Sequence, residues 1–197
     1  MNKKFTLAVF LIIILSSFSK AYSIEADVFV QSTINRAANT LGGNLSKEER
    51  IVKLKEIAKD TVDIEGIGFY SLGANRKNAT EDQINKYKAA FSEYFLKSFS
   101  SRLAEYSNPE IEVNSKKVIN ENYTIVLSTL AGTDNRPEVK IEWRVYTKYP
   151  DNLLIRDLII EGLSLARTQK EEFASIINSN DGNIDALIEN LSDFAAK

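Results

Sequence analysis

Residues 139–145 alternate strictly between apolar and charged side chains, and this alternation restricts the fold more than any other feature of the chain. The apolar positions would share one face of a strand, and they are Val139, Ile141, Trp143 and Val145. The positions between them are lysine, glutamate and arginine. A strand of this kind turns one face to water and needs cover on the other. The rest of the chain must supply that cover.

Three further segments have the composition of strands, and short polar turns separate them. The predicted strands are residues 111–118, 123–130, 138–148 and 152–160. The turns contain asparagine, glycine or proline, at residues 120–122, 132–137 and 150–152. Because links this short join neighbouring strands, we expect an antiparallel meander. The fourth strand is apolar in both alternation frames, Leu154-Leu158-Ile160 and Ile155-Ile159, so either face could point inward.

Helical periodicity lies on both sides of the strands. The predicted helices before them are residues 30–41, 46–58, 63–72 and 80–106. Ser46 and Thr80 each begin a capping box, Thr168 begins another in the tail, and Asn183 caps the last helix. Helices, then strands, then helices is the order of an α+β domain. We therefore expect a twisted antiparallel four-stranded sheet covered on one face by N- and C-terminal helices.

The longest predicted helix carries a wide aromatic stripe at helical spacing. Its members are Tyr87, Phe91, Tyr94, Phe95, Phe99, Leu103 and Tyr106. Such a stripe can be a core face packed against the sheet, or part of it can form the wall of an apolar cavity. The sequence alone leaves both interpretations open.

The first residues have the pattern of a signal peptide. Lys3 and Lys4 precede an apolar run at residues 5–15, and small residues favour cleavage near Ala21 or Ser23. A retained anchor is the alternative, although a bilayer span needs about 20 apolar residues. We expect residues 1–23 to be removed and residues 24–197 to form a single exported, periplasmic domain.

Composition excludes several function classes. The chain has no histidine and no cysteine, so neither a Ser-His-Asp nor a Cys-His arrangement can form, and the commonest zinc ligands are missing. Without residues 1–23 it has 22 basic and 27 acidic residues, which argues against a nucleic-acid partner. No phosphate-binding glycine motif follows a strand. We expect no cofactor, no metal and no catalytic residues.

One carboxylate pair keeps an enzymatic alternative open. Asp157 and Glu161 lie four residues apart on a predicted strand, about 13 Å from each other, which is long for an acid–base pair. Asp157 can equally be a structural carboxylate that accepts hydrogen bonds from the backbone or from an arginine. The alternative function is an exported small-molecule-binding enzyme or sensor with a cone-shaped α+β fold that uses these two residues.

Two segments resemble the MlaC family of periplasmic phospholipid-binding proteins, also described as the toluene-tolerance auxiliary component of an ABC transporter. Residues 69–73 (FYSLG) and 79–83 (ATEDQ), before the aromatic helix, are similar to the family pattern L-G-x-x-W-R-x-A-T-P-E-Q. Residues 157–165 (DLIIEGLSL) and 169–173 (QKEEF) are similar to its D-v-x-v-e-G-x-S-l strand and q-R-x-E-F helix. Lys170 stands where the family has arginine, and lysine lacks the bidentate fork of arginine.

The resemblance implies a lipid carrier. It implies a deep apolar pocket between sheet and helices that holds phospholipid tails. Its partners would be an inner-membrane MCE-type transporter subunit and an outer-membrane lipoprotein complex, and we expect a monomer with no nucleic-acid partner. Residues 47–59 and 75–77 could be docking surfaces or solvated faces. If the pocket exists, its candidate lining residues are Phe91, Phe95, Phe99, Tyr123, Ile125, Leu127, Val139, Ile141, Trp143, Val145, Leu154, Leu158, Ile160 and Phe173.

Overall fold

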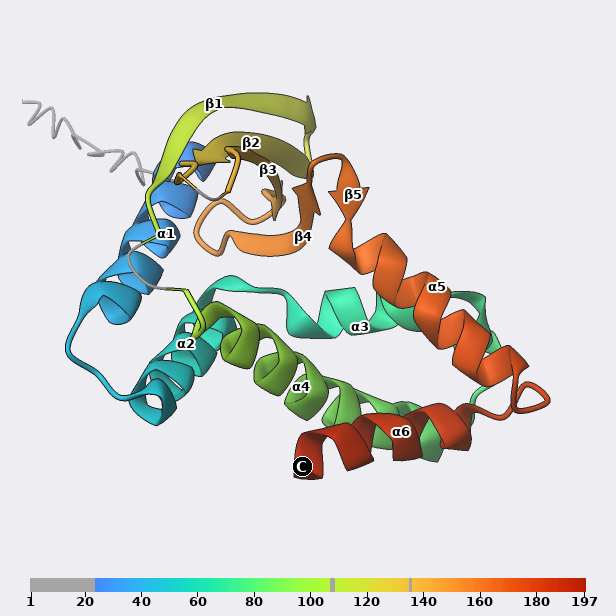
Figure 1. The fold of residues 1–197 in the computed structure, drawn as a ribbon. Helices are drawn as coiled ribbons and strands as arrows, with labels where there is room; N and C mark the ends of the chain where they lie inside the picture. The colour runs from blue at the N-terminus through green and yellow to red at the C-terminus, as the bar shows by residue number, and fades with distance from the viewer. Residues whose placement is uncertain (1–23, 107–108, 135) are drawn as a thin grey trace, which may run out of the picture.

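A computed structural model describes residues 24–106, 109–134 and 136–197, and Figure 1 shows their arrangement. The described helices are α1 (Ala26–Gly42), α2 (Lys47–Thr61), α3 (Ile64–Leu72), the 3-10 helix η1 (Gly73–Lys77), α4 (Glu81–Leu103), α5 (Leu165–Asn178) and α6 (Ile184–Ala196). The described strands are β1 (Ile111–Asn120), β2 (Tyr123–Leu130), β3 (Val139–Tyr146), β4 (Leu154–Ile160) and β5 (Leu163–Ser164). The predicted signal peptide, residues 1–23, lies outside the described residues.

The strands form one antiparallel sheet in the order β1-β2-β3-β4-β5, which confirms the predicted α+β meander. The predicted count of four strands was one short, because two residues after β4 turn back as β5. Glu161 (φ 49°) and Gly162 (φ 82°) make this turn with two positive φ angles in succession. That is the pattern of the tight turns that suit the twist of a hairpin.

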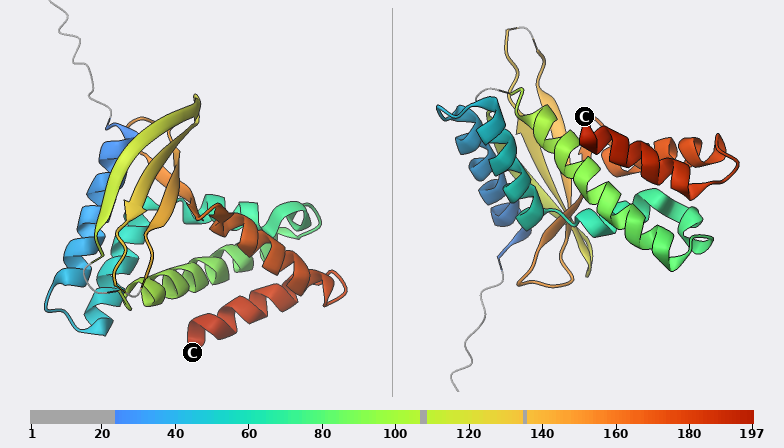
Figure 2. Two further views of the ribbon diagram at one scale, coloured as in Figure 1. Left: turned by 45° about the horizontal axis from the view of Figure 1, so that its top comes forward. Right: turned by 90° about the horizontal axis from the view of Figure 1, so that it is seen from below.

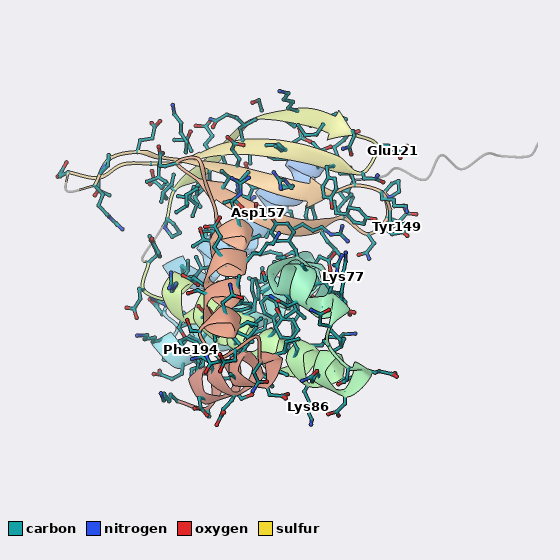
Figure 3. All side chains as sticks on the ribbon, turned by 90° about the vertical axis from the view of Figure 1, so that its right-hand side faces the viewer. Lys77, Lys86, Glu121, Tyr149, Asp157 and Phe194 are labelled. Atoms are coloured by element: carbon teal, nitrogen blue, oxygen red, sulfur yellow. The ribbon has the colours of Figure 1, made fainter. Side chains whose placement is uncertain are left out.

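The helices lie in two groups around the sheet. In both views of Figure 2, α1 and α2 are at one end of the molecule, α5 and α6 are at the other, and α4 crosses between them. Val30 and Ile34 of α1 belong to the same buried cluster as Val126 and Trp143, so α1 covers one face of the sheet. At the opposite edge, α5 packs against β4 and β5, and in Figure 3 Asp157 lies where the sheet meets α5.

The predicted helix starts are confirmed at three caps and wrong at one. Ser46 and Thr80 form capping boxes, and Asn183 accepts a hydrogen bond from the backbone of Asp185. Thr168 does not begin a helix. The cap is Ser164, whose Oγ accepts from the Arg167 N–H at 3.1 Å, so α5 starts one turn earlier than predicted. The long helix ends at Leu103 rather than near residue 106.

Among residues 24–106, 109–134 and 136–197, no helix is both long enough and apolar enough to cross a membrane.

Candidate functional site

The predicted aromatic stripe of α4 divides into two parts with different surroundings. Tyr87 and Phe91 are buried and surround Phe173 of α5 in edge-to-face contacts, with ring centroids 6.3 and 6.0 Å from the Phe173 ring. Phe95 and Phe99 are only partly buried and stack on each other, with centroids 5.6 Å apart and planes 10° apart. The first part is therefore core, whereas the second leaves aromatic surface accessible.

Close packing of α3 fixes the buried part of the stripe. The Tyr87 hydroxyl donates to the Gly68 carbonyl at 2.9 Å, and burial raises the pKa of Tyr87. A Cβ at position 68 would lie 2.8 Å from the Phe91 ring. Helices α3 and α4 thus approach at a distance that only glycine permits at this point.

One face of the sheet is buried against the helices, and it includes four of the predicted pocket residues of β3. Ile141, Trp143 and Val145 are buried, whereas Val139 at the start of the strand is partly buried. The Trp143 indole N–H donates to Ser128 Oγ at 2.8 Å, so the one polar atom of that ring is satisfied. Trp143 can therefore present its ring to apolar neighbours.

The fourth strand joins this face through a β-bulge. Ile155 pairs with Val145 and Leu158 pairs with Trp143, but two residues between them oppose the single residue Arg144. The bulge therefore changes the alternation frame in the middle of the strand. Ile155, Leu158 and Ile160 therefore lie on the covered face. This set matches neither of the two alternation frames that the sequence left open.

Partly buried apolar residues of the sheet and of helix α4 form a candidate site, here called the apolar seam. Leu130 pairs with Val139, Ile160 pairs with Ile141, and Leu158 pairs with Trp143, so all lie on the covered face. The described residues that are partly buried and pack against the main core include members from both the sheet and α4. The apolar seam consists of Phe95, Phe99, Leu130, Val139, Leu158 and Ile160.

The structure does not bring four predicted pocket residues to the seam. Ile125 pairs with Arg144, Leu127 with Glu142, and Leu154 with Tyr146, so they lie on the face opposite Trp143. Tyr123 lies there too. The β2 residues that do share the covered face are Thr124, Val126, Ser128 and Leu130. Sequence reasoning missed them because this frame contains Thr124 and Ser128, whereas the frame of Ile125 and Leu127 is more apolar. The pairing of Thr124 with Val145 identifies the covered frame.

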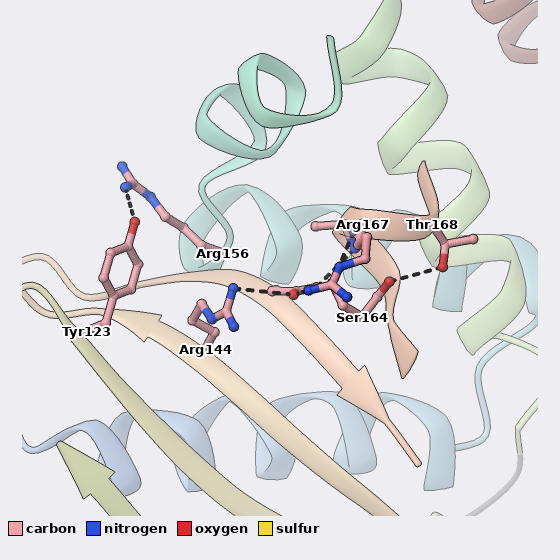
Figure 4. A network of polar contacts seen from close by, with 8 residues as sticks. Tyr123, Arg144, Arg156, Ser164, Arg167 and Thr168 are labelled. Carbon is pink, nitrogen blue, oxygen red and sulfur yellow. Dashed lines mark hydrogen bonds and ion pairs between the residues drawn. The ribbon is translucent and has the colours of Figure 1, made fainter. Parts of the chain in front are cut away.

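Tyr123 instead belongs to a cluster around Arg156. Its hydroxyl accepts a hydrogen bond from Arg156 Nη1 at 2.8 Å, and Arg156 Nε donates to Asp63 Oδ2 at 2.6 Å. The guanidinium lies 3.6 Å from the centroid of Tyr146, and Figure 4 shows Arg156 next to Tyr123. Asp63 Oδ1 accepts from the Gly66 N–H and so caps α3. The cluster therefore fastens the start of α3 to the sheet.

Asp157 acts as a structural acceptor. Its side chain is buried; Oδ2 accepts from Ser164 Oγ at 2.6 Å, and Oδ1 accepts from the Ala166 N–H at 3.0 Å. Arg144 Nη1 lies 3.8 Å from Asp157 Oδ2. Figure 4 labels Arg144 and draws its polar contact as a dashed line. Glu161, the other residue of the enzymatic alternative, accepts from the Lys140 N–H. Both carboxylates are engaged by the fold, and Asp157 holds the beginning of α5 on the sheet.

Two recesses in the described part of the chain lie outside the seam. One, of about 230 Å³, lies between α3 and α4; Phe91 lines it, and the Lys88–Glu65 ion pair is at its rim. The other, of about 370 Å³, is at the end of α1, next to Gly42 and Pro109. The recess that Phe91 lines is smaller than the range of about 300–1,000 Å³ typical of ligand pockets. Neither recess is lined by a residue of the seam.

Within residues 24–106, 109–134 and 136–197, no group of three Asp or Glu side chains lies close enough together to hold a metal ion.

Comparisons with known proteins agree on one family. The family model described as MlaC protein matches residues 29–193. The intermembrane phospholipid transport system binding protein MlaC of Haemophilus influenzae is 22% identical over 209 residues, covering 100% of this chain and 95% of the relative. A solved phospholipid-binding protein from Ralstonia solanacearum, in complex with a phospholipid, has a TM-score of 0.72 at 21% identity and covers 88% of this chain and 98% of its own. At that identity, the likeness to the solved structure shows the fold.

Proposed function

The chain belongs to the MlaC family, and from this premise we propose that it is a phospholipid-binding transport protein that carries lipid tails in the apolar seam. The observation that most supports the proposal is that a protein of the same fold was solved with a phospholipid bound. The seam adds a physical reason, because five of its six partly buried residues, from both the sheet and α4, pack against the same buried core.

Apolar burial explains why such a carrier is needed. The two chains of a phospholipid contain about thirty methylenes, and at about 0.8 kcal/mol each their exposure to water costs on the order of 25 kcal/mol. A carrier lowers this cost by replacing the bilayer with apolar side chains. Phe95 and Phe99 suit this task, since they offer aromatic surface that the fold itself does not fully bury.

The lining that we propose is narrower than the set predicted from the sequence. It comprises the seam together with Ile141 and Trp143, the buried residues that pair with Ile160 and Leu158. Phe173 packs instead against Tyr87 and Phe91 in the core. No seam residue lines either of the two recesses described above, and we propose that acyl chains enter when α4 and α5 separate from the sheet. Asp157 would keep the beginning of α5 attached to β4 during that movement.

The family and the predicted signal peptide support a periplasmic setting. We propose that the protein works in the periplasm as a monomer. It would pass phospholipid between an outer-membrane lipoprotein complex and an inner-membrane ABC transporter with an MCE-type subunit. We propose no catalysis, since Asp157 and Glu161 both serve as acceptors within the fold.

Organic extraction of the purified protein, followed by mass spectrometry, tests the proposal. We expect phospholipid in the wild type and much less in Val139→Asp, which places an unpaired carboxylate in the seam. Ile125→Asp is the matched control, because Ile125 is also a partly buried strand residue but lies on the opposite face. It should retain the lipid. Repeated extraction of the wild type without phospholipid would refute the carrier proposal. Equal loss in the two folded variants would place the site elsewhere.

A further inference from the structure

Two segments that pack together carry cations and no carboxylate. Residues 66–80 contain Arg76 and Lys77, and residues 162–170 contain Arg167 and Lys170, whereas neither segment has an aspartate or glutamate. The chain as a whole has more acidic than basic residues, 27 against 25. Helix α5 packs against both α3 and η1, so the two segments are adjacent in space. In Figure 3, α5 and Lys77 appear on the same side of the molecule. We call this surface the basic face.

The cations of the basic face are available for an external partner. Among the described residues, none of the four has a carboxylate oxygen within 4.0 Å, whereas Lys86, Lys88 and Lys116 elsewhere are paired. The Lys170 ammonium instead lies 5.2 Å from the ring of Tyr70, which is 44% exposed. The acidic residues that flank the two segments in sequence are Glu65, Glu81, Glu161 and Glu171. Glu65 pairs with Lys88, and Glu161 accepts from the Lys140 N–H.

Two exposed leucines lie within the second segment. Leu163 is 59% exposed and Leu165 is 43% exposed. Leu163 pairs with Ile160 of the seam, and Ile160 pairs with Ile141 of the core. The exposed apolar surface is therefore continuous with the seam along one row of the sheet.

We propose that the basic face docks the protein on an anionic lipid bilayer. Arg76, Lys77, Arg167 and Lys170 would contact lipid phosphates, and the two leucines would enter the headgroup region. A bilayer fits better than an acidic protein because Leu163 continues into the seam, so an acyl chain could move between bilayer and seam without crossing water. This inference rests on the proposed function.

Co-sedimentation of the full-length mature protein with vesicles tests the inference. The probes are phosphatidylcholine vesicles with and without about one-third phosphatidylglycerol, each at low and at high salt. We expect binding to the anionic vesicles at low salt and its loss at high salt, because screening weakens contacts to phosphates. Since each cation near an anionic surface is worth about fivefold in affinity, the Arg167→Gln/Lys170→Gln variant should bind about 25-fold more weakly.

Matched variants on α2 provide the controls. Lys53→Gln/Lys59→Gln removes the same charge from another exposed surface, and Val52→Ser is the counterpart of Leu163→Ser/Leu165→Ser, since Val52 is 55% exposed. The controls should bind vesicles as the wild type does, whereas the leucine variant should bind more weakly. Circular dichroism verifies that each variant is folded.

The outcomes separate this inference from the proposed function. Weaker vesicle binding with unchanged extracted phospholipid supports the basic face. Absence of wild-type binding to anionic vesicles, or equal losses in the α2 controls, overturns it and leaves the carrier proposal intact. A wild type that binds vesicles through the basic face but never yields phospholipid on extraction would support docking and refute the carrier.

Discussion

The two ends of the aromatic stripe on α4 have the same kind of sequence and different surroundings. Tyr87 and Phe91 are enclosed by α3 and by Phe173 of α5, and a glycine at position 68 brings α3 into contact with the Phe91 ring. Phe95 and Phe99, one and two turns further on, are covered only in part. An aromatic stripe therefore specifies apolar surface, while the neighbouring elements decide whether that surface stabilises the fold or remains available to a ligand.

Phe91→Ala should have the largest effect on stability. The buried ring contacts Tyr87, Phe95 and Phe173, so its removal leaves a cavity between α3, α4 and α5. We expect a loss of about 3–5 kcal/mol in the free energy of unfolding. Urea denaturation followed by circular dichroism measures it. A loss below about 1 kcal/mol would contradict the assignment of this end of the stripe to the core.

Phe99→Ala should separate stability from ligand binding. Since Phe99 is partly exposed and stacks on Phe95, we expect a loss of about 2 kcal/mol, below the range for a buried phenylalanine. Affinity for a phospholipid should fall about tenfold, which corresponds to about 1.4 kcal/mol of lost apolar contact. Denaturation and lipid titration of the same preparation measure both quantities. If Phe99→Ala destabilises as strongly as Phe91→Ala and leaves lipid affinity unchanged, the two ends do not differ in role.

Gly68→Ala tests the close contact that encloses the first end. The new methyl group would lie 2.8 Å from the Phe91 ring. Overpacking costs about 1–3 kcal/mol, and the higher helix propensity of alanine offsets up to about 1 kcal/mol, so we expect a net loss of about 1 kcal/mol. Phe91→Leu should relieve the clash. A double-mutant cycle of the two substitutions should therefore show coupling, and additive effects would argue against the contact.

Most of the fold could be predicted because its signals are local. The alternation of residues 139–145 identified the covered face of β3, and the box residues Ser46 and Thr80 identified two helix starts. Thr168 also has box spacing, yet Ser164 is the cap, because the hydroxyl of Ser164 both binds Asp157 and accepts from the Arg167 N–H. That choice depends on a contact across seven residues of sequence, which a local motif cannot encode.

The candidate site was harder to predict because it depends on which strand residues face inward. In β4 a bulge opposite Arg144 changes the frame, and no single alternation describes both Ile155 and Leu158. In β2 the covered frame contains Thr124 and Ser128, so composition favours the opposite face, which carries Ile125 and Leu127. The register with β3 decides, since Val126 pairs with Trp143 and Ile125 with Arg144. Pairing across strands, rather than the pattern within one strand, therefore decides which residues share the covered face.

The smallest expected effect distinguishes the two tyrosines of the stripe. The hydroxyl of Tyr87 donates to a buried carbonyl at 2.9 Å, whereas that of Tyr94 donates to Gln169 Oε1 at 3.0 Å in a partly buried position. Tyr87→Phe leaves the Gly68 carbonyl without this donor and should cost about 1 kcal/mol near neutral pH. Tyr94→Phe should cost less, because water can replace the lost contact. Urea denaturation at neutral pH compares the two variants.

The stability of the same two variants at alkaline pH tests how deeply each tyrosine is buried. Burial raises the pKa of both tyrosines in the folded protein, whereas in the unfolded chain tyrosine titrates near a pKa of about 10. Above that pH the unfolded chain binds fewer protons than the folded one, so the free energy of unfolding decreases as pH rises. Lysines titrate in both variants and cancel from the comparison. Tyr87→Phe should therefore lose less stability between about pH 9 and pH 11 than Tyr94→Phe does, because it lacks the more deeply buried phenol. Parallel pH curves would mean that the phenols of Tyr87 and Tyr94 are equally accessible to water.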